Sequence, residues 1–347
     1  PTALREAFEP AHLRLPKEVL ITVMRKHQRY FPVVDGAGEL MPYFVAVRNG
    51  PTAYLDVVQA GNEGVLRARY ADADYFFRAD RSHKLEEFTQ RLATLTFQVK
   101  LGSMLDKVHR VEQLVPTLAP MMGLSDDELK TARRAASLFK SDLATQMVVE
   151  LTSLQGVMGR EYAMLSGEDP AVATAIFEHY LPRYQGDRLP SSGAGLLVGL
   201  ANRLDSLVGL FAAGLAPAGA ADPFGLRRDA LGVVQALAGA GHPFDLRPAL
   251  QATAALEPVT AGEQTIGEVL TFVRDRLYGW LRDQGLPHDV VTAVLAERSW
   301  DPFAATIASR DLAALVTASD WNELLTTYAR CKRIVRPLAE TYPLAPE

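Results

Sequence analysis

The sequence predicts a mainly α-helical protein that begins with a short α+β module. Three observations favour this fold class. Strand-like segments and a hairpin-type turn are confined to the first 80 residues. From about residue 62 onward, apolar residues recur at the spacing of helix faces. Asp, Pro and Gly mark the junctions between these segments, as is typical of helix starts and ends.

The composition is that of a globular protein of more than one domain. The chain has 347 residues, of which 48% are hydrophobic and 22% charged, which is long enough for two or three domains. The net charge of −5 means that a nucleic-acid partner would need a local basic patch. The single cysteine, Cys331, excludes a disulfide framework and a cysteine-based metal site, and fits a reducing cytoplasm.

Neither a membrane span nor a signal peptide is predicted. The most apolar long segment, 196–215, contains Asn202, Arg203 and Asp205, which indicate a buried helix. The chain begins at Pro1 inside a plausible element, so we expect it to be a fragment of a longer protein.

Residues 1–80 form the predicted α+β module. Segments 19–24, 30–34 and 43–47 are rich in β-forming residues. Between the second and third lies Asp-Gly-Ala-Gly at 35–38, a composition typical of hairpin turns.

A basic stretch separates the first two of these segments. It carries Arg25, Lys26 and Arg29 beside Tyr30. Positive side chains next to an aromatic ring suit contacts with a phosphate backbone combined with base stacking. A solvated turn is the alternative, and the sequence leaves both open.

A second group of arginines lies at the end of the module. Arg67, Arg69 and Arg78 alternate with aromatic residues in a helical segment, and Arg81 follows it. These arginines are candidates for phosphate contacts, while some of the aromatic rings belong to a core.

Helix signals continue through residues 81–216. The pattern predicts amphipathic helices at 84–101 and 104–118. Ser125, three residues before Glu128, forms a capping box, and Asp169-Pro170 starts a further helix.

The segment 138–163 is an apolar helical run that carries unexpected polar residues. Lys140, Ser141 and Asp142 come first, and Glu150 is followed by Gly156 and Gly159. A helix that brings an acidic residue inward and then breaks at glycines often builds a site. A buried helix with a capped end is the alternative.

The C-terminal part, 217–347, is predicted to be entirely helical after a linker at 216–221. Asp222-Pro223 opens a helix that contains Arg227 and Arg228, which are either phosphate contacts or salt-bridged structure. We expect helices at 224–239, 246–256, 264–284, 287–297, 302–309, 311–317 and 320–338.

One set of residues resembles the HD domain, a helical fold whose phosphohydrolase members bind a divalent metal through a His, a His-Asp pair and a later Asp. His109 and Asp142 match that pattern. Ser141 replaces the His of the pair, and Asn202, in Ala-Asn-Arg-Leu, replaces the later Asp. We therefore expect an HD-like domain over 81–216 with a degenerate site and no metal. A buried Asp142 should then pair with Lys140 or a backbone donor.

Six segments follow one another along the chain: LPKEVLITVMRKHQRYFPV (15–33), GNEGVLRARYADADYFFRADR (61–81), LGSMLDKVHRV (101–111), ELTSLQGVMGREYA (150–163), LPSS (189–192) and DPFGLRRDALG (222–232). In this order they resemble the β subunit of bacterial heterotetrameric glycyl-tRNA synthetase. Beyond about residue 235 the resemblance is looser, and segment 325–338 resembles the start of a helical anticodon-binding domain.

The resemblance implies a fragment that lacks the N-terminal part and most of the anticodon-binding domain. Residues 1–80 would be the end of a B3/B4-like module, and 217–347 a helical body leading into the anticodon-binding domain. The implied function is a non-catalytic, cytoplasmic subunit that binds glycine tRNA. Its α subunit partner would use ATP and Mg for aminoacylation in an α2β2 assembly.

The residues agree with this resemblance because the sequence contains no phosphate-binding loop, nucleophile elbow or HExxH motif. The alternative function is a metal-dependent HD-type phosphohydrolase acting on nucleotides or RNA ends. A protein scaffold that makes no RNA contact is a third possibility.

Overall fold

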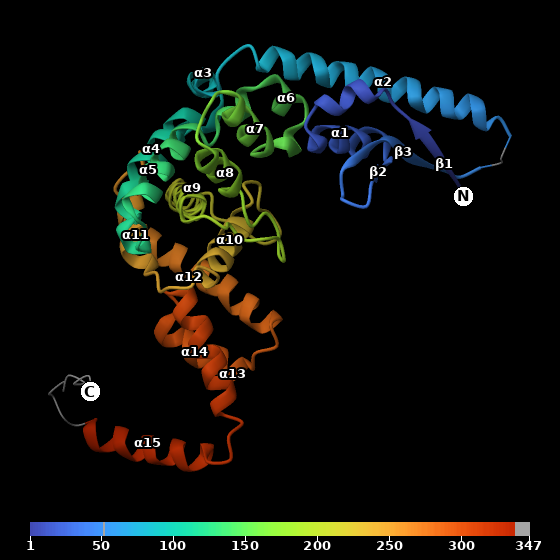
Figure 1. Cartoon of the computed structure of the whole chain (residues 1–347). Coiled ribbons are helices and arrows are strands. Elements are labelled where there is room, and N and C mark those ends of the chain that lie inside the picture. Colours follow the sequence, from blue (N-terminus) through green and yellow to red (C-terminus); the bar gives the residue numbers. More distant parts are fainter. Residues whose placement is uncertain (51–52, 337–347) are drawn as a thin grey trace.

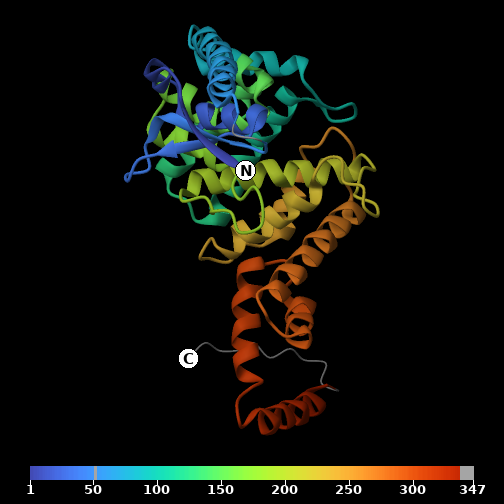
Figure 2. The same ribbon diagram turned by 90° about the vertical axis from the view of Figure 1, so that its right-hand side faces the viewer.

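The computed structural model describes residues 1–50 and 53–336, which form an extended array of helices with a small sheet at one end (Figures 1 and 2). The N-terminal module lies at one extremity, a block of packed helices lies in the middle, and α15 (Trp321–Val335) lies at the other extremity. The prediction of a mainly α-helical protein with an N-terminal α+β module is confirmed.

The N-terminal module is a three-stranded antiparallel sheet with two helices. The strands are β1 (Thr2–Ala7), β2 (Phe31–Val34) and β3 (Leu40–Arg48), in the order β1-β3-β2. The hairpin between β2 and β3 is confirmed, whereas β1 was not predicted. The long helix α2 (Leu55–Asp80) runs from this module to the helical block (Figure 1).

The predicted strand at 19–24 is wrong. These residues form α1 (Lys17–Val23), which continues into a π-helical turn, Met24–Gln28. Val19, Leu20 and Val23 are buried, and their spacing of one and four residues fits one face of a helix. The β-branched composition favoured a strand, but burial of this face decides the structure.

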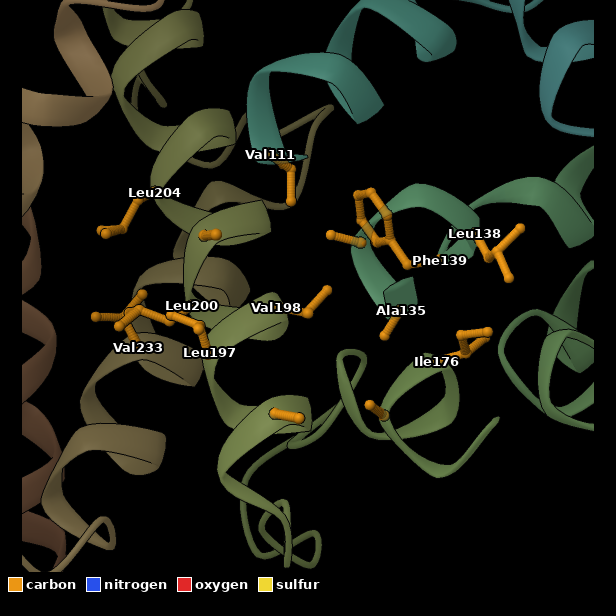
Figure 3. Packing of buried hydrophobic residues seen from close by; sticks show 14 of the residues in the cluster. Val111, Ala135, Leu138, Phe139, Ile176, Leu197, Val198, Leu200, Leu204 and Val233 are labelled. Atoms are coloured by element: carbon orange, nitrogen blue, oxygen red, sulfur yellow. The ribbon is translucent and has the colours of Figure 1, made fainter. Parts of the chain in front are cut away.

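The helical block contains most of the hydrophobic core. Figure 3 shows Val111, Ile176 and Val198, each from a different helix, around Phe139, which directly follows another helix. The elements are α3 (Leu85–Thr89), β4 (Thr96–Gln98), β5 (Gly102–Ser103), α4 (Met104–Leu118), α5 (Asp126–Leu138), α6 (Gln146–Glu150), α7 (Val157–Leu165), α8 (Pro170–Glu178) and α9 (Gly193–Ala212).

Helix α9 is the central helix of this block. By length and composition alone it could cross a membrane, but 89% of its apolar window is buried inside the protein. The predicted buried helix at 196–215 is thus confirmed, with a start three residues earlier. The capping box at Ser125 and the Asp169 cap before Pro170 are also confirmed.

Two predicted helices of the block are broken. Segment 84–101 is α3, a 3-10 helix (Gln90–Thr94) and strand β4, because only its first half has an apolar face to bury: Leu92 is fully buried but Val99 is 88% exposed. Segment 138–163 consists of short helices separated by turns, and the side chain of Glu150 is exposed instead of pointing inward.

The C-terminal helices follow the prediction closely. Predicted helices 302–309 and 311–317 are one continuous helix, and residues 337–338 of the last prediction lie outside the described residues. The helices are α10 (Leu226–Ala238), α11 (Leu246–Ala254), α12 (Glu263–Asp283), α13 (His288–Arg298), α14 (Pro302–Leu315) and α15.

Helix α10 begins two residues later than predicted. Its N-cap is Gly225, which has φ 71°. The Asp222 carboxylate still caps the helix, since it accepts hydrogen bonds from the backbone N of Leu226 at 2.8 Å and of Arg227 at 2.9 Å.

Candidate functional site

Asp142, the acidic residue of the HD-like pattern, is hydrogen-bonded to the protein backbone. Asp142 is fully buried, and its Oδ2 accepts hydrogen bonds from the backbone N of Gly156 at 2.6 Å and of Gly159 at 3.1 Å. Burial raises the pKa of Asp142 to about 6, against the opposite effect of these amides and of the Lys140 charge. The expectation that Asp142 pairs with a backbone donor is confirmed for Oδ2, whereas the buried Oδ1 has no hydrogen-bond partner among the described protein atoms.

Both glycines are required by close packing. Gly156 has φ +80°, and a Cβ there would lie 2.5 Å from the ring of Tyr180. A Cβ on Gly159 would lie 2.8 Å from Ile176 and 3.1 Å from the Asp142 carboxylate. The glycines therefore serve a close approach between α7, α8 and the turn that carries Asp142.

The other members of the pattern are dispersed. His109 is exposed on α4, whose buried face instead carries Lys107 and Arg110. The hydroxyl of Ser141 is buried and lies 2.6 Å from that of Thr89. Asn202 lines a cavity that neither Asp142 nor His109 lines.

These residues do not fit a divalent metal. One Asp142 oxygen accepts hydrogen bonds from two backbone amides, and His109 is exposed on α4. Over residues 1–50 and 53–336, there is no group of three or more His, Cys, Asp or Glu side chains placed to hold a metal ion. The donor set that metal phosphohydrolysis requires is therefore not assembled.

A cavity of about 360 Å³ lies beside α4, α9 and α10. Its charged and polar lining consists of Lys107, Lys140, Ser153, Gln155, His179, Tyr180, Arg183, Asn202, Arg203, Ser206, Arg228 and Asp229. Its apolar lining includes Phe97, Met104, Leu143 and Phe224. Lys140 and Asn202 were identified from the sequence, whereas His179 and Asp229 were not.

Below this cavity lies a buried ionic network that was not predicted. Asp205 accepts from Lys107 Nζ at 2.5 Å and from Arg110 Nε at 2.6 Å. Arg110 Nε also lies 3.5 Å from Glu257. Burial, and then the charge of Asp205, raise the pKa of Glu257 to about 8. Lys107 and Arg110, three residues apart on an otherwise apolar helix face, were the available signal.

The basic stretch after α1 is mostly exposed. Arg25 and Arg29 make no ion pair within the described residues, whereas Lys26 Nζ donates to the carbonyl of Glu150 at 3.1 Å. Tyr30 is only 8% exposed, and its ring stacks on Phe44 at 4.8 Å between centroids. The ring belongs to the module's core, so its burial does not favour the predicted role in base stacking.

Most arginines of α2 are exposed but paired. Arg67 lies 3.3 Å from Glu9, Arg69 3.9 Å from Asp72, and Arg78 3.0 Å from Asp74. Exposed Arg81 has no ion pair among the described residues, and its guanidinium lies 5.4 Å from the Phe77 ring centroid. Exposed ion pairs are weak, so the paired arginines remain available for a stronger phosphate partner.

The two arginines of α10 differ. Arg227 donates to the carbonyls of Gly219 at 2.6 Å and Ala221 at 3.3 Å, and so fastens the loop before the helix. Arg228 is exposed, lines the cavity, and forms no ion pair within the described part of the chain. The structure gives Arg227 a structural contact and leaves Arg228 available to a ligand.

Comparison with known proteins identifies the family. A family model described as glycyl-tRNA synthetase beta subunit matches residues 1–296. The glycine–tRNA ligase beta subunit of Syntrophotalea carbinolica is 44% identical over 347 residues, covering 98% of this chain and 50% of that protein. That of Halothermothrix orenii is 45% identical and covers 87% and 44%.

An Arabidopsis thaliana protein, glycine–tRNA ligase, chloroplastic/mitochondrial 2, is 41% identical over 97% of this chain and 31% of its own length. The chain thus spans about half the length of the bacterial relatives it matches. With the family model matching residues 1–296, these similarities show that the chain belongs to the glycyl-tRNA synthetase beta subunit family.

Proposed function

We propose that this chain is part of the non-catalytic β subunit of a cytoplasmic glycine–tRNA ligase, in which it binds tRNA and assembles with the α subunit. The observation that carries this proposal is the family match over residues 1–296, with relatives named as beta subunits of that ligase. A beta subunit implies an α partner, which would use ATP and Mg for aminoacylation. We infer an α2β2 heterotetramer for the full-length proteins.

The interior of the helical block supports a non-catalytic role. Its buried acidic groups are engaged in structure: Asp142 with two amides, and Asp205 with Lys107 and Arg110. General acid–base or metal chemistry requires such groups to face a substrate. The chemistry of the ligase therefore belongs to the partner chain in this proposal.

The unpaired surface arginines support tRNA binding. Arg25, Arg29 and Arg81 are exposed, and within the described residues none has a carboxylate partner to release before it meets a phosphate. An acidic protein can bind RNA through such local positive groups, with affinity that falls as salt rises. No observation favours the phosphohydrolase alternative, because the candidate ligands are separated.

A tRNA titration tests this proposal. The 347-residue chain is mixed with glycine tRNA and with a non-cognate tRNA at two salt concentrations. We expect salt-dependent binding, and a preference for glycine tRNA would indicate identity elements within this chain. Equal binding of both tRNAs would support backbone contacts alone. Absence of binding at low salt would contradict the tRNA-binding role.

Assembly is tested separately. The full-length β subunit and the α subunit are copurified and assayed for glycine-dependent charging of tRNA. We expect the α subunit to need the β subunit for charging. Charging by the α subunit alone at an unchanged rate would overturn the assembly role.

A further inference from the structure

The cavity beside α4, α9 and α10 has an unusual charge distribution. Lys140, which is only 7% exposed, lies in the wall of this cavity. Its Nζ lies 3.0 Å from His179 Nε2 and 4.0 Å from the Tyr180 ring centroid. Within the described residues no carboxylate lies in ion-pair distance of this ammonium group. Burial, and then the positive charge of Lys107, lower the pKa of Lys140 to about 7, and an anion bound beside Nζ would favour its protonated form.

His179 does not compensate this charge. Its Nδ1 lies 2.5 Å from the carbonyl of Ile176, so Nδ1 carries the proton and Nε2 offers a lone pair to Lys140. Burial, and then the positive charge of Lys140, lower the pKa of His179 well below its usual value. A neutral imidazole therefore accepts a hydrogen bond from the ammonium group and leaves its charge uncancelled.

Further cations around the cavity strengthen the positive field. Arg203 is buried and donates to the carbonyls of Tyr180 at 3.0 Å and Leu181 at 2.8 Å, but forms no ion pair within the described chain. Arg228 contributes a second uncancelled charge at the surface. Asp229 is the only carboxylate among the described lining residues. Two other basic lining residues, Lys107 and Arg183, are already paired with carboxylates outside the lining, Asp205 and Asp187.

Two neutral polar atoms of the lining lack partners. The hydroxyl of Tyr180 and Oδ1 of Asn202 are buried, and neither has a hydrogen-bond partner among the described protein atoms. The same cavity also has an apolar wall, to which Phe97, Met104 and Phe224 contribute. A volume of about 360 Å³ is in the range of small-molecule sites.

We propose that this cavity binds a small phosphate-bearing molecule of the mononucleotide class. The phosphate interacts with Lys140 and Arg228, and the flat ring lies against the apolar wall. Tyr180 and Asn202 supply a hydrogen-bond donor and an acceptor for the rest of the ligand. This inference does not depend on the proposed tRNA-ligase function.

The experiment is a calorimetric titration of the full chain with AMP and inorganic phosphate, and with adenosine as the uncharged control. We expect saturable binding of AMP, competition by phosphate, and much weaker binding of adenosine. Lys140→Met should weaken AMP binding roughly tenfold or more, because a charge-assisted hydrogen bond is lost. Lys130→Met, which removes the charge of an exposed lysine on α5, should leave AMP binding unchanged.

Asp229→Asn provides a test of opposite sign. Removal of the one carboxylate in the described lining should tighten AMP binding several-fold, and Arg228→Gln should weaken it several-fold. If Lys140→Met does not fold, the Asp229→Asn and Arg228→Gln variants test whether AMP binds in this cavity. The proposal is overturned if AMP does not bind saturably at millimolar concentration, or if neither variant of the pair alters its affinity. Dependence of tRNA binding, but not AMP binding, on Lys140 would equally overturn it and make the cavity an RNA contact.

Discussion

The buried acidic residues of the helical block and the exposed arginines of the N-terminal module differ in whether the protein itself supplies their partners. Asp142 and Asp205 each receive two or more hydrogen bonds from the protein itself. Arg25, Arg29 and Arg81 have no carboxylate partner within the described residues. A charge that the fold already satisfies serves the fold, whereas an exposed and unpaired charge costs little in stability and is available to a partner.

This comparison separates two groups of residues that the sequence offered as candidates. The segment around Asp142 resembled a degenerate metal site, and its polar residues hold short helices together. The exposed arginines, which the sequence indicated as candidates for phosphate contacts, remain the better candidates for ligand contacts. Lys140 is the exception, because it is buried and yet has no carboxylate partner in the described structure.

The largest effect should follow from removing the Asp142 carboxylate. Asp142→Ala leaves the buried amides of Gly156 and Gly159 without an acceptor, so we expect a loss of about 3 kcal/mol or more in the free energy of unfolding. Urea denaturation measures this loss. Asp142→Asn, which keeps one acceptor oxygen, should lose less, and exposed Asp127→Ala should change stability by under about 0.5 kcal/mol. Equal stability of Asp142→Ala and Asp127→Ala would remove the structural role of Asp142.

A smaller effect is expected at the glycine that faces Asp142. Gly159→Ala places a methyl group 2.8 Å from Ile176, and should cost about 1–3 kcal/mol in unfolding free energy. Gly267→Ala is the matched control, because this position within α12 has no atom within 4 Å of the added Cβ. The control should gain about 0.5–1 kcal/mol from helix propensity. Stabilisation by both substitutions would mean that the close approach at Gly159 can relax.

The fold was predictable where a local signal acts alone. The capping box at Ser125 and the cap at Asp169 set helix starts within the chain segment that carries them, and both were identified. Segment 84–101 failed because its apolar spacing continues past the point where a partner surface exists, so Val99 is exposed. Segment 19–24 failed because β-branched residues also suit the buried face of a short helix.

The candidate site was less predictable because it depends on contacts distant in sequence. Asp142 and Asn202 come from different segments. No local pattern shows that the Asp142 carboxylate accepts from the Gly156 amide, or that the backbone carbonyl of Asn202 accepts from Lys107 Nζ. The orientation of His109 depends on which side of α4 packs against α9, and that side carries Lys107 and Arg110. A charged residue at a core-facing helix position was the signal that could have identified this network.

The buried network should also have a pH signature. The pKa of Glu257 is raised to about 8, from an ordinary value of 4.5, so the folded protein retains a proton that the unfolded chain releases. The stabilising contribution of this group is complete below pH 4.5 and is lost as the pH rises towards 8. The loss cannot exceed about 1.4 kcal/mol per pH unit for one group.

Glu257→Gln isolates this contribution from other titrating groups. Buried His179, with its lowered pKa, favours folding as pH rises through 6.5 and so opposes the trend in both proteins. The difference in unfolding free energy, wild type minus variant, should therefore fall between pH 5 and pH 8. A difference that stays constant with pH would show that Glu257 is ionised in the folded protein.

The smallest effect on stability, and the clearest on binding, is expected at the exposed arginines. Arg81→Gln should change the unfolding free energy by less than about 0.5 kcal/mol, because no ion pair is lost within the described residues. If Arg81 contacts a phosphate, the slope of log affinity for tRNA against log salt should decrease in magnitude by about one, equally for all tRNAs. Arg247→Gln is the control, because Arg247 is already paired with Asp245 at 2.7 Å, in the C-terminal helices. An unchanged slope in Arg81→Gln would reject this residue as a phosphate contact. The same result for Arg25→Gln and Arg29→Gln would mean that the exposed arginines of the N-terminal module do not bind tRNA, and the contrast with the buried acidic residues would lose its functional meaning.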